Sequence, residues 1–173
     1  INYWLFIMEQ IIILAKSFSH LLLSLPFSLS GATRYTENDV KAYWQPPGYV
    51  FGIVWPVLYL IFGIINLRVE FSTKYNETFK RLVFHQSIQE SLLQALWLWV
   101  TAKDGDKPRY KFQYILGFVI MLYLVNYAFM HRSKTFSRYT ELNFLYIPYK
   151  IWISFALILS FQQLIRSIYL RVK

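Results

Sequence analysis

The chain has 173 residues, of which 56% are hydrophobic, 20% aromatic and only 16% charged, a balance that favours an integral membrane protein over a soluble domain. The net charge of +9 comes from lysines and arginines that fall mostly between apolar runs, where lipid headgroups would meet them, so we do not expect nucleic-acid binding. Without cysteine, disulfides, thiolate nucleophiles and cysteine metal sites are excluded.

Five apolar runs approach the roughly 20 residues that a helix needs to cross a bilayer. In chain order they cover residues 3–28, 49–67, 82–100, 112–130 and 144–168. The first run carries Glu9 and Lys16, and the third is distinctly polar. We therefore predict an all-α integral membrane fold, a five-transmembrane-helix bundle that forms a single domain over residues 1–173.

The second run follows the pair Pro46-Pro47 and contains Pro56. Two prolines fit the first turn of a helix, so the chain is expected to enter the membrane there. Pro56 lies within the predicted helix, where it should kink the backbone or rearrange its hydrogen bonds.

Polar residues recur along one face of the third predicted helix. Gln86, Glu90, Gln94 and Trp97 are spaced by four, four and three residues, which stacks them toward the bundle interior. This stripe predicts either hydrogen bonding between helices or the polar wall of a ligand pocket. Glu90 and Lys150 lie at similar depth, and we expect them to form a buried ion pair or to lie close together.

Tryptophan also occurs deep inside predicted helices, at Trp55, Trp97 and Trp152. Their flat indole rings could line a slot for a planar, apolar molecule, or pack between helices. Trp44 and Tyr49 fit the aromatic belt at a membrane surface instead.

Two segments resemble a known family. The run from Pro46 to Gly52, followed by Val54-Trp55, Leu58-Tyr59 and Gly63, resembles the second-helix signature of the translocator proteins, or tryptophan-rich sensory proteins (TspO/MBR). Pro148-Tyr149, with Trp152 and Phe155-Ala156, is similar to the family's fifth-helix pattern. The resemblance extends over nearly the whole chain.

This resemblance implies a five-helix bundle whose cavity binds porphyrins, sterols or related lipids, often as a homodimer, in a mitochondrial membrane if the source is eukaryotic. The implied ligand-binding residues are Trp44, Pro46, Pro47, Phe51, Trp55, Tyr59, Gln94, Trp97, Tyr149 and Trp152. Leu164, Tyr169 and Arg171 satisfy a loose cholesterol-binding pattern.

The chain departs from the family at interior polar positions. Gln94 replaces an asparagine, Glu90 a glutamine and Ser160 an asparagine, while Tyr35 and Ala42 replace loop residues. Such changes allow the fold to persist while the pocket changes or closes.

Enzymatic chemistry has little support, because the three histidines are scattered and no glycine-rich phosphate loop occurs. We predict a protein that is not an enzyme, requires no cofactor, and contacts membrane lipids and either a second copy or other membrane subunits. Two functions remain open: binding of a porphyrin, sterol or lipid, or a structural role in a larger assembly such as a mitochondrial respiratory complex.

Overall fold

The computed structural model describes residues 3–30, 39–102 and 107–170. Across these ranges the protein is helical and contains no strand, which confirms the all-α prediction. The elements are α1 (Tyr3–Ser17), α2 (Ser19–Ser30), α3 (Gly48–Phe71), α4 (Glu77–Thr101), α5 (Lys111–Tyr127), the π-helical turn η1 (Ala128–Arg132), α6 (Ser133–Phe136) and α7 (Thr140–Tyr169).

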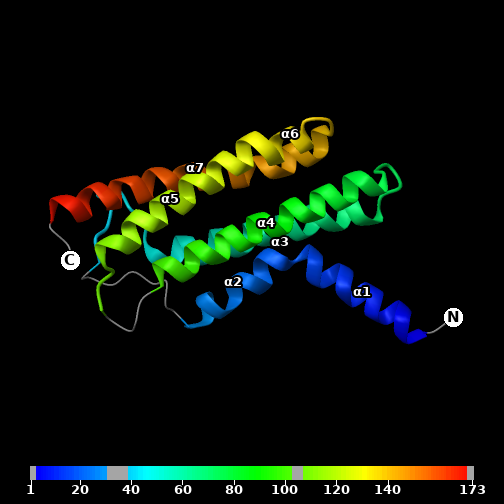
Figure 1. The fold of residues 1–173 in the computed structure, drawn as a ribbon, viewed down its shortest axis with the longest axis horizontal. Helices are drawn as coiled ribbons and strands as arrows, with labels where there is room; N and C mark the ends of the chain where they lie inside the picture. Colours follow the sequence, from blue (N-terminus) through cyan, green and yellow to red (C-terminus); the bar gives the residue numbers. More distant parts are fainter. Residues whose placement is uncertain (1–2, 31–38, 103–106, 171–173) are drawn as a thin grey trace.

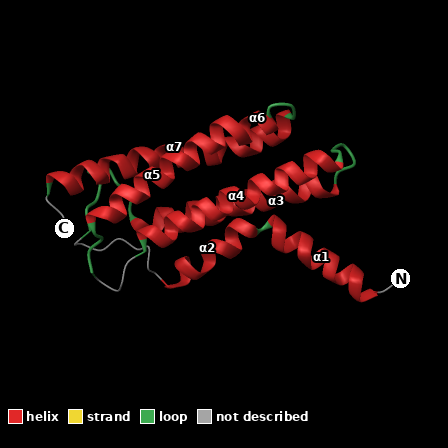
Figure 2. Ribbon diagram, viewed as in Figure 1, coloured by secondary structure: helices red, strands yellow, loops and turns green. Residues whose placement is uncertain are grey.

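The helices form an elongated bundle (Figure 1). Helices α3 and α4 run side by side, as do α5 and α7, while α6 continues the line of α5. Helix α2 packs against α3 and α4, and α1 turns away from the bundle. The connections between α3 and α4 and between α6 and α7 lie at one end of the bundle, whereas the short connection between α1 and α2 lies between the two ends (Figure 2).

Three segments are long and apolar enough to cross a bilayer: α3, residues 111–136, and α7. The bent pair formed by α1 and the first part of α2 raises this number to four. Helix α4 has 25 residues and is long enough to cross, but it is much less apolar than α3 because it carries the polar stripe. The predicted count of five spans is therefore not confirmed.

The surface supports a lipid environment. Large apolar side chains such as Ile53, Val119 and Ile151 are exposed, whereas a soluble protein rarely exposes apolar area on this scale. The buried core lies between the helices and includes Phe62, Ile65, Met121, Leu124, Tyr146 and Ile153. The apolar surface and the apolar helices together indicate an integral multi-pass membrane protein.

The prediction of one continuous helix over residues 3–28 is wrong, because α1 and α2 meet at Phe18 at an angle of 65°. Phe18 packs directly against Gly63 of α3, where a β-carbon would collide with its ring. The Asn66 amide donates a hydrogen bond of 3.0 Å to the Ser17 carbonyl oxygen at the break. Contacts from α3 thus stabilise a bend that hydrophobicity does not reveal.

Helix α3 begins at Gly48, directly after Pro47, and continues through Pro56 without a break. Pro56 lies on the outer face, and Gly52, one turn earlier, has open space around its α-carbon. The proline ring is therefore exposed on the side of α3 that faces away from the core.

An ion pair connects neighbouring segments at each end of the bundle. At one end, Glu141 accepts hydrogen bonds from Lys74 (2.6 Å) and Tyr75 (3.0 Å). Burial, and to a lesser extent the hydrogen bond to this carboxylate, raise the pKa of the Tyr75 hydroxyl to about 12. At the other end, the Arg109 guanidinium lies 3.0 Å from the buried Asp39 carboxylate.

Candidate functional site

Aromatic side chains from α3, α4 and α7 meet in the bundle interior. The Trp55 ring centroid lies 6.4 Å from that of Trp97, 6.0 Å from that of Trp152 and 5.8 Å from that of Tyr59. We call Trp55, Tyr59, Trp97, Tyr149 and Trp152 the aromatic cluster; Tyr149 lies against Phe62, 4.6 Å away. The structure thus brings together five of the residues that the sequence singled out.

Several buried polar atoms at the aromatic cluster have no hydrogen-bond partner among the described residues. They are Trp97 Nε1, Tyr149 Oη and Trp152 Nε1. Each buried group without a partner costs about 1–3 kcal/mol, and native proteins satisfy most of them with protein, water or ligand. The cluster therefore offers three hydrogen-bond donors to a molecule inserted between its rings.

The aromatic cluster is closely packed as it stands. A cavity of about 10 Å³ borders Trp97, Gly117 and Ser160, which is at the lower limit for one water molecule. A ligand larger than water would have to displace at least one ring. Trp55 lies at the centre of these ring contacts, so its rotation would open the most space.

The remaining predicted ligand-binding residues lie toward the start of α3. Phe51 is 5.7 Å from Trp152 between ring centroids. Trp44 lies 5.5 Å from Phe155, which in turn stacks on Trp152. Pro46 and Pro47 occupy the connection directly before α3. This part of the predicted set approaches the aromatic cluster through Trp152.

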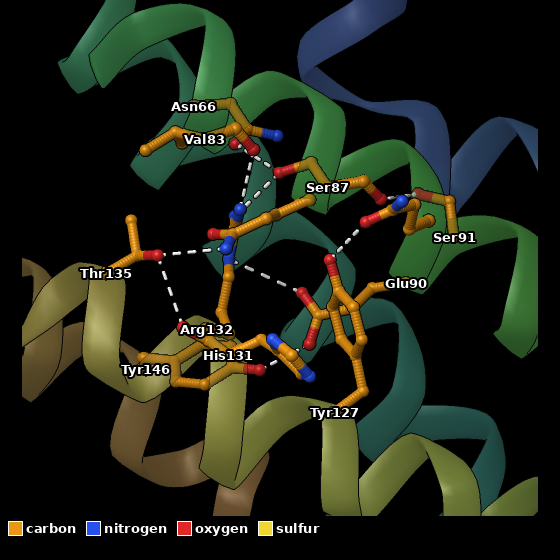
Figure 3. Close-up of polar contacts among 12 residues, drawn as sticks. Asn66, Val83, Ser87, Glu90, Ser91, Tyr127, His131, Arg132, Thr135 and Tyr146 are labelled. Carbon is orange, nitrogen blue, oxygen red and sulfur yellow. Dashed lines mark hydrogen bonds and ion pairs between the residues drawn. The ribbon is translucent and has the colours of Figure 1, made fainter. Parts of the chain in front are cut away.

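A second site surrounds Glu90, whose side chain is fully buried (Figure 3). Its Oε2 atom lies 3.4 Å from Arg132 Nε, and Tyr146 donates a hydrogen bond to Oε1. The expected pairing of Glu90 with Lys150 is not found. Lys150 Nζ instead lies 3.5 Å from Asn143 Oδ1 and above the Phe129 ring.

The Arg132 guanidinium extends this polar site into a network that joins η1 to α4, α3 and the end of α1 (Figure 3). It donates to the Val83 carbonyl oxygen and to Ser87 Oγ, both at 2.6 Å. Ser87 Oγ donates to Asn66 Oδ1 at 2.7 Å, and Asn66 also holds the Ser17 carbonyl at the α1–α2 bend. The buried Arg132 guanidinium is thereby linked to the α1–α2 bend by hydrogen bonds through the Ser87 and Asn66 side chains.

The polar stripe of α4 faces the bundle interior, as its spacing predicts: Gln86, Glu90 and Gln94 are buried. Sequence reasoning missed Ser87 and Ser91, which the same helical spacing could have included. It also missed His20, whose Nδ1 lies 2.9 Å from Ser91 Oγ while its ring stacks on Phe62. Nothing in the local sequence marks Arg132 as the partner of Glu90.

The sequence model of the TspO/MBR family matches residues 14–166 of the chain. This protein belongs to the TspO/MBR family. The matched region begins within α1 and ends within α7, so it contains the aromatic cluster and the Glu90–Arg132 network. No curated protein and no solved structure matches the chain.

In this TspO/MBR protein, two residues of the cholesterol pattern, Leu164 and Tyr169, lie in the last turns of α7. Leu164 is half-buried, and Tyr169, the last residue of the helix, is 85% exposed. Arg171 lies outside the described residues. Tyr35, one of the residues that depart from the family pattern, also lies outside them.

Proposed function

We propose that this TspO/MBR protein binds a hydrophobic ligand, a porphyrin, sterol or lipid, at the aromatic cluster. The observation that carries the proposal is the set of buried polar atoms without partners between the rings of α3, α4 and α7. Buried polar groups are usually satisfied, so the set favours a molecule that brings hydrogen-bond acceptors into an aromatic slot.

The hydrogen-bond donors and ring faces of the aromatic cluster indicate which chemical features a ligand needs. Trp97, Tyr149 and Trp152 each have a donor to offer, which suits carboxylate, carbonyl or hydroxyl oxygens on the ligand edge. The ring faces suit a flat apolar body. No chemical step is required of the protein, and we propose that it acts as a binder, not as an enzyme, and needs no resident cofactor.

We further propose that the chain crosses the bilayer five times, with the α1–α2 pair, α3, α4, α5 to α6, and α7 as the spans. Helix α4 is included because it lies alongside α3 (Figure 1) and directs its polar residues inward, away from lipid. The proposed setting is a mitochondrial membrane for a eukaryotic source, with membrane lipids and a second copy or other subunits as partners.

A structural subunit of a larger membrane complex is the second candidate. It is favoured by the close packing of Trp55 against Trp97 and Trp152, with only about 10 Å³ of space beside Trp97. In that case the ligand pocket has closed, and the Glu90–Arg132 network serves to hold the bundle in shape. The same network is compatible with ligand binding, so it does not separate the two candidates.

Titration with protoporphyrin IX separates the two functions. We expect saturable binding at micromolar concentrations, measured from the absorbance of the porphyrin, and binding about tenfold weaker or absent in Trp55→Ala and Trp152→Ala. Trp99→Ala is the matched control, because Trp99 is 65% exposed and outside the cluster. It should bind as the unmodified protein does.

Two results would contradict ligand binding at the cluster. One is porphyrin binding that Trp55→Ala and Trp99→Ala weaken equally, which would indicate a surface or detergent effect. The other is the absence of saturable binding by porphyrin, sterol and lipid alike, together with purification in a large detergent-stable complex. The second result would support the structural subunit.

A further inference from the structure

A crevice separates the diverging helix α1 from α3 and α4. Its volume is about 140 Å³, and it lies on the opposite side of the α1–α2 bend from α2. Apolar side chains form part of its wall, including Ile13 of α1, Val69 of α3 and Phe84 of α4. The crevice does not include any residue of the aromatic cluster.

Charged side chains surround the same crevice. Lys16 of α1, Lys80 and Arg81 of α4, and the carboxylates Glu70 and Glu77 line it. Lys80 and Glu77 pair with each other at 3.1 Å. Within the described ranges, Lys16, Arg81 and Glu70 form no ion pair, although Lys16 Nζ lies 4.9 Å from the centre of the Phe84 ring.

The position of the crevice corresponds to a membrane surface. It lies near the end of α3 and the first turns of α4, next to the connection at residues 72–76. Large side chains of α1 beyond it are exposed and apolar, among them Phe6, Met8 and Ile12. A charged crevice beside an apolar helix matches the two parts of a phospholipid, the headgroup and the acyl chains.

We propose that this crevice binds the headgroup of an aminophospholipid, with the lipid chains lying along α1. Lys16 and Arg81 hold the phosphate, and Glu70 accepts a hydrogen bond from the ammonium group. The charges favour this class over an anionic lipid, because two unpaired cations and one unpaired carboxylate complement one phosphate and one amine. Phosphatidylglycerol carries the same phosphate but no amine, so it would leave Glu70 without a cation.

Retention of defined lipids tests the proposal. The protein is reconstituted with phosphatidylethanolamine, phosphatidylglycerol, phosphatidylcholine or diacylglycerol, and bound lipid is counted by native mass spectrometry. We expect phosphatidylethanolamine to be retained most strongly and diacylglycerol least. The double variant Lys16→Gln/Arg81→Gln should retain phosphatidylethanolamine about tenfold less, because each basic residue near a headgroup contributes to the attraction.

Two further variants make the test specific. Glu70→Gln should lose the preference for phosphatidylethanolamine over phosphatidylglycerol while still retaining phospholipid. The pair Lys134→Gln/Arg138→Gln removes two exposed basic residues outside the crevice, and it should retain lipid as the unmodified protein does. Melting temperatures in detergent check that every variant is folded.

The proposal fails if Lys16→Gln/Arg81→Gln and Lys134→Gln/Arg138→Gln retain phosphatidylethanolamine equally, or if diacylglycerol is retained as strongly as phosphatidylethanolamine. A preference for phosphatidylglycerol that Glu70→Gln does not change would also overturn it. Displacement of the lipid by millimolar inorganic phosphate would identify a site for the free anion instead. None of these outcomes depends on porphyrin binding at the aromatic cluster.

Discussion

At the scale of single residues, Arg132 explains why Glu90 can be buried without Lys150. The planar Arg132 guanidinium contacts three acceptors at once: the Glu90 carboxylate, the Val83 carbonyl and Ser87 Oγ. A lysine ammonium is a compact charge that holds its water more strongly. Lys150 accordingly remains only half-buried, beside Asn143.

Replacing Arg132 with leucine should destabilise the bundle strongly. Arg132→Leu would leave the Glu90 carboxylate buried without its cation, and the loss of one partner of a buried pair costs about 3–5 kcal/mol. We expect a clear fall in the melting temperature in detergent. Lys134→Leu is the control, because this nearby lysine is exposed and should change stability little.

The double variant Glu90→Gln/Arg132→Leu completes this test. If Glu90 and Arg132 stabilise the fold as a pair, the double variant should lose less stability than the sum of the losses measured for Glu90→Gln and Arg132→Leu alone. Additive losses would mean that Arg132 acts mainly through Val83 and Ser87, not through Glu90.

At the scale of helices, the bend between α1 and α2 depends on one close contact. Gly63 of α3 has no side chain, which allows the Phe18 ring to lie against the backbone at the bend. The apolar runs of the sequence predict four helical segments whose ends differ from the observed ends by one to six residues. The bend could not be predicted from the sequence. Residues 3–28 form one apolar run, and Phe18 meets Gly63 only after folding.

A methyl group at position 63 should disturb this contact. Gly63→Ala is expected to cost about 1–3 kcal/mol, because the added carbon overlaps the Phe18 ring and the packing must shift. Gly52→Ala in the same helix is the matched control, since nothing lies within 4 Å of a β-carbon there. Because alanine favours helix over glycine, this control should be neutral or slightly stabilising.

Thermal melting of the two variants in detergent compares them directly, and protease cleavage near Phe18 reports on the bend. Equal melting temperatures for Gly63→Ala and Gly52→Ala would show that α1 and α2 add little to the stability of the bundle. The close packing of Phe18 against α3 would then not be what holds the bend.

At the scale of the whole molecule, the number of membrane crossings rests on α4. Its polar residues lower its hydropathy, but Gln86, Glu90 and Gln94 are buried against neighbouring helices. Hydropathy averages over all faces of a helix, whereas lipid meets only the outer face. A helix can therefore cross the bilayer while its average remains below that of its neighbours.

Cysteine labelling tests the five crossings without background, because the chain contains no cysteine. We expect Thr73→Cys and Ser137→Cys to react with an impermeant maleimide from one side of a sealed vesicle. Tyr43→Cys and Lys107→Cys should react from the other. Labelling of positions 73 and 107 from the same side would show that α4 does not cross.

The membrane class, the family and the approximate positions of most helices follow from the amino-acid sequence, because apolar run length and the two proline-aromatic motifs are local properties. The sequence also places Gln86, Glu90 and Gln94 on one face of a helix, since that depends on spacing alone. Folding decides which groups meet across helices. The pairing of Glu90 with Arg132, the bend at Phe18 and the meeting of three tryptophans depend on how each helix is rotated and shifted against its neighbours, and that is set by packing between residues far apart in the chain.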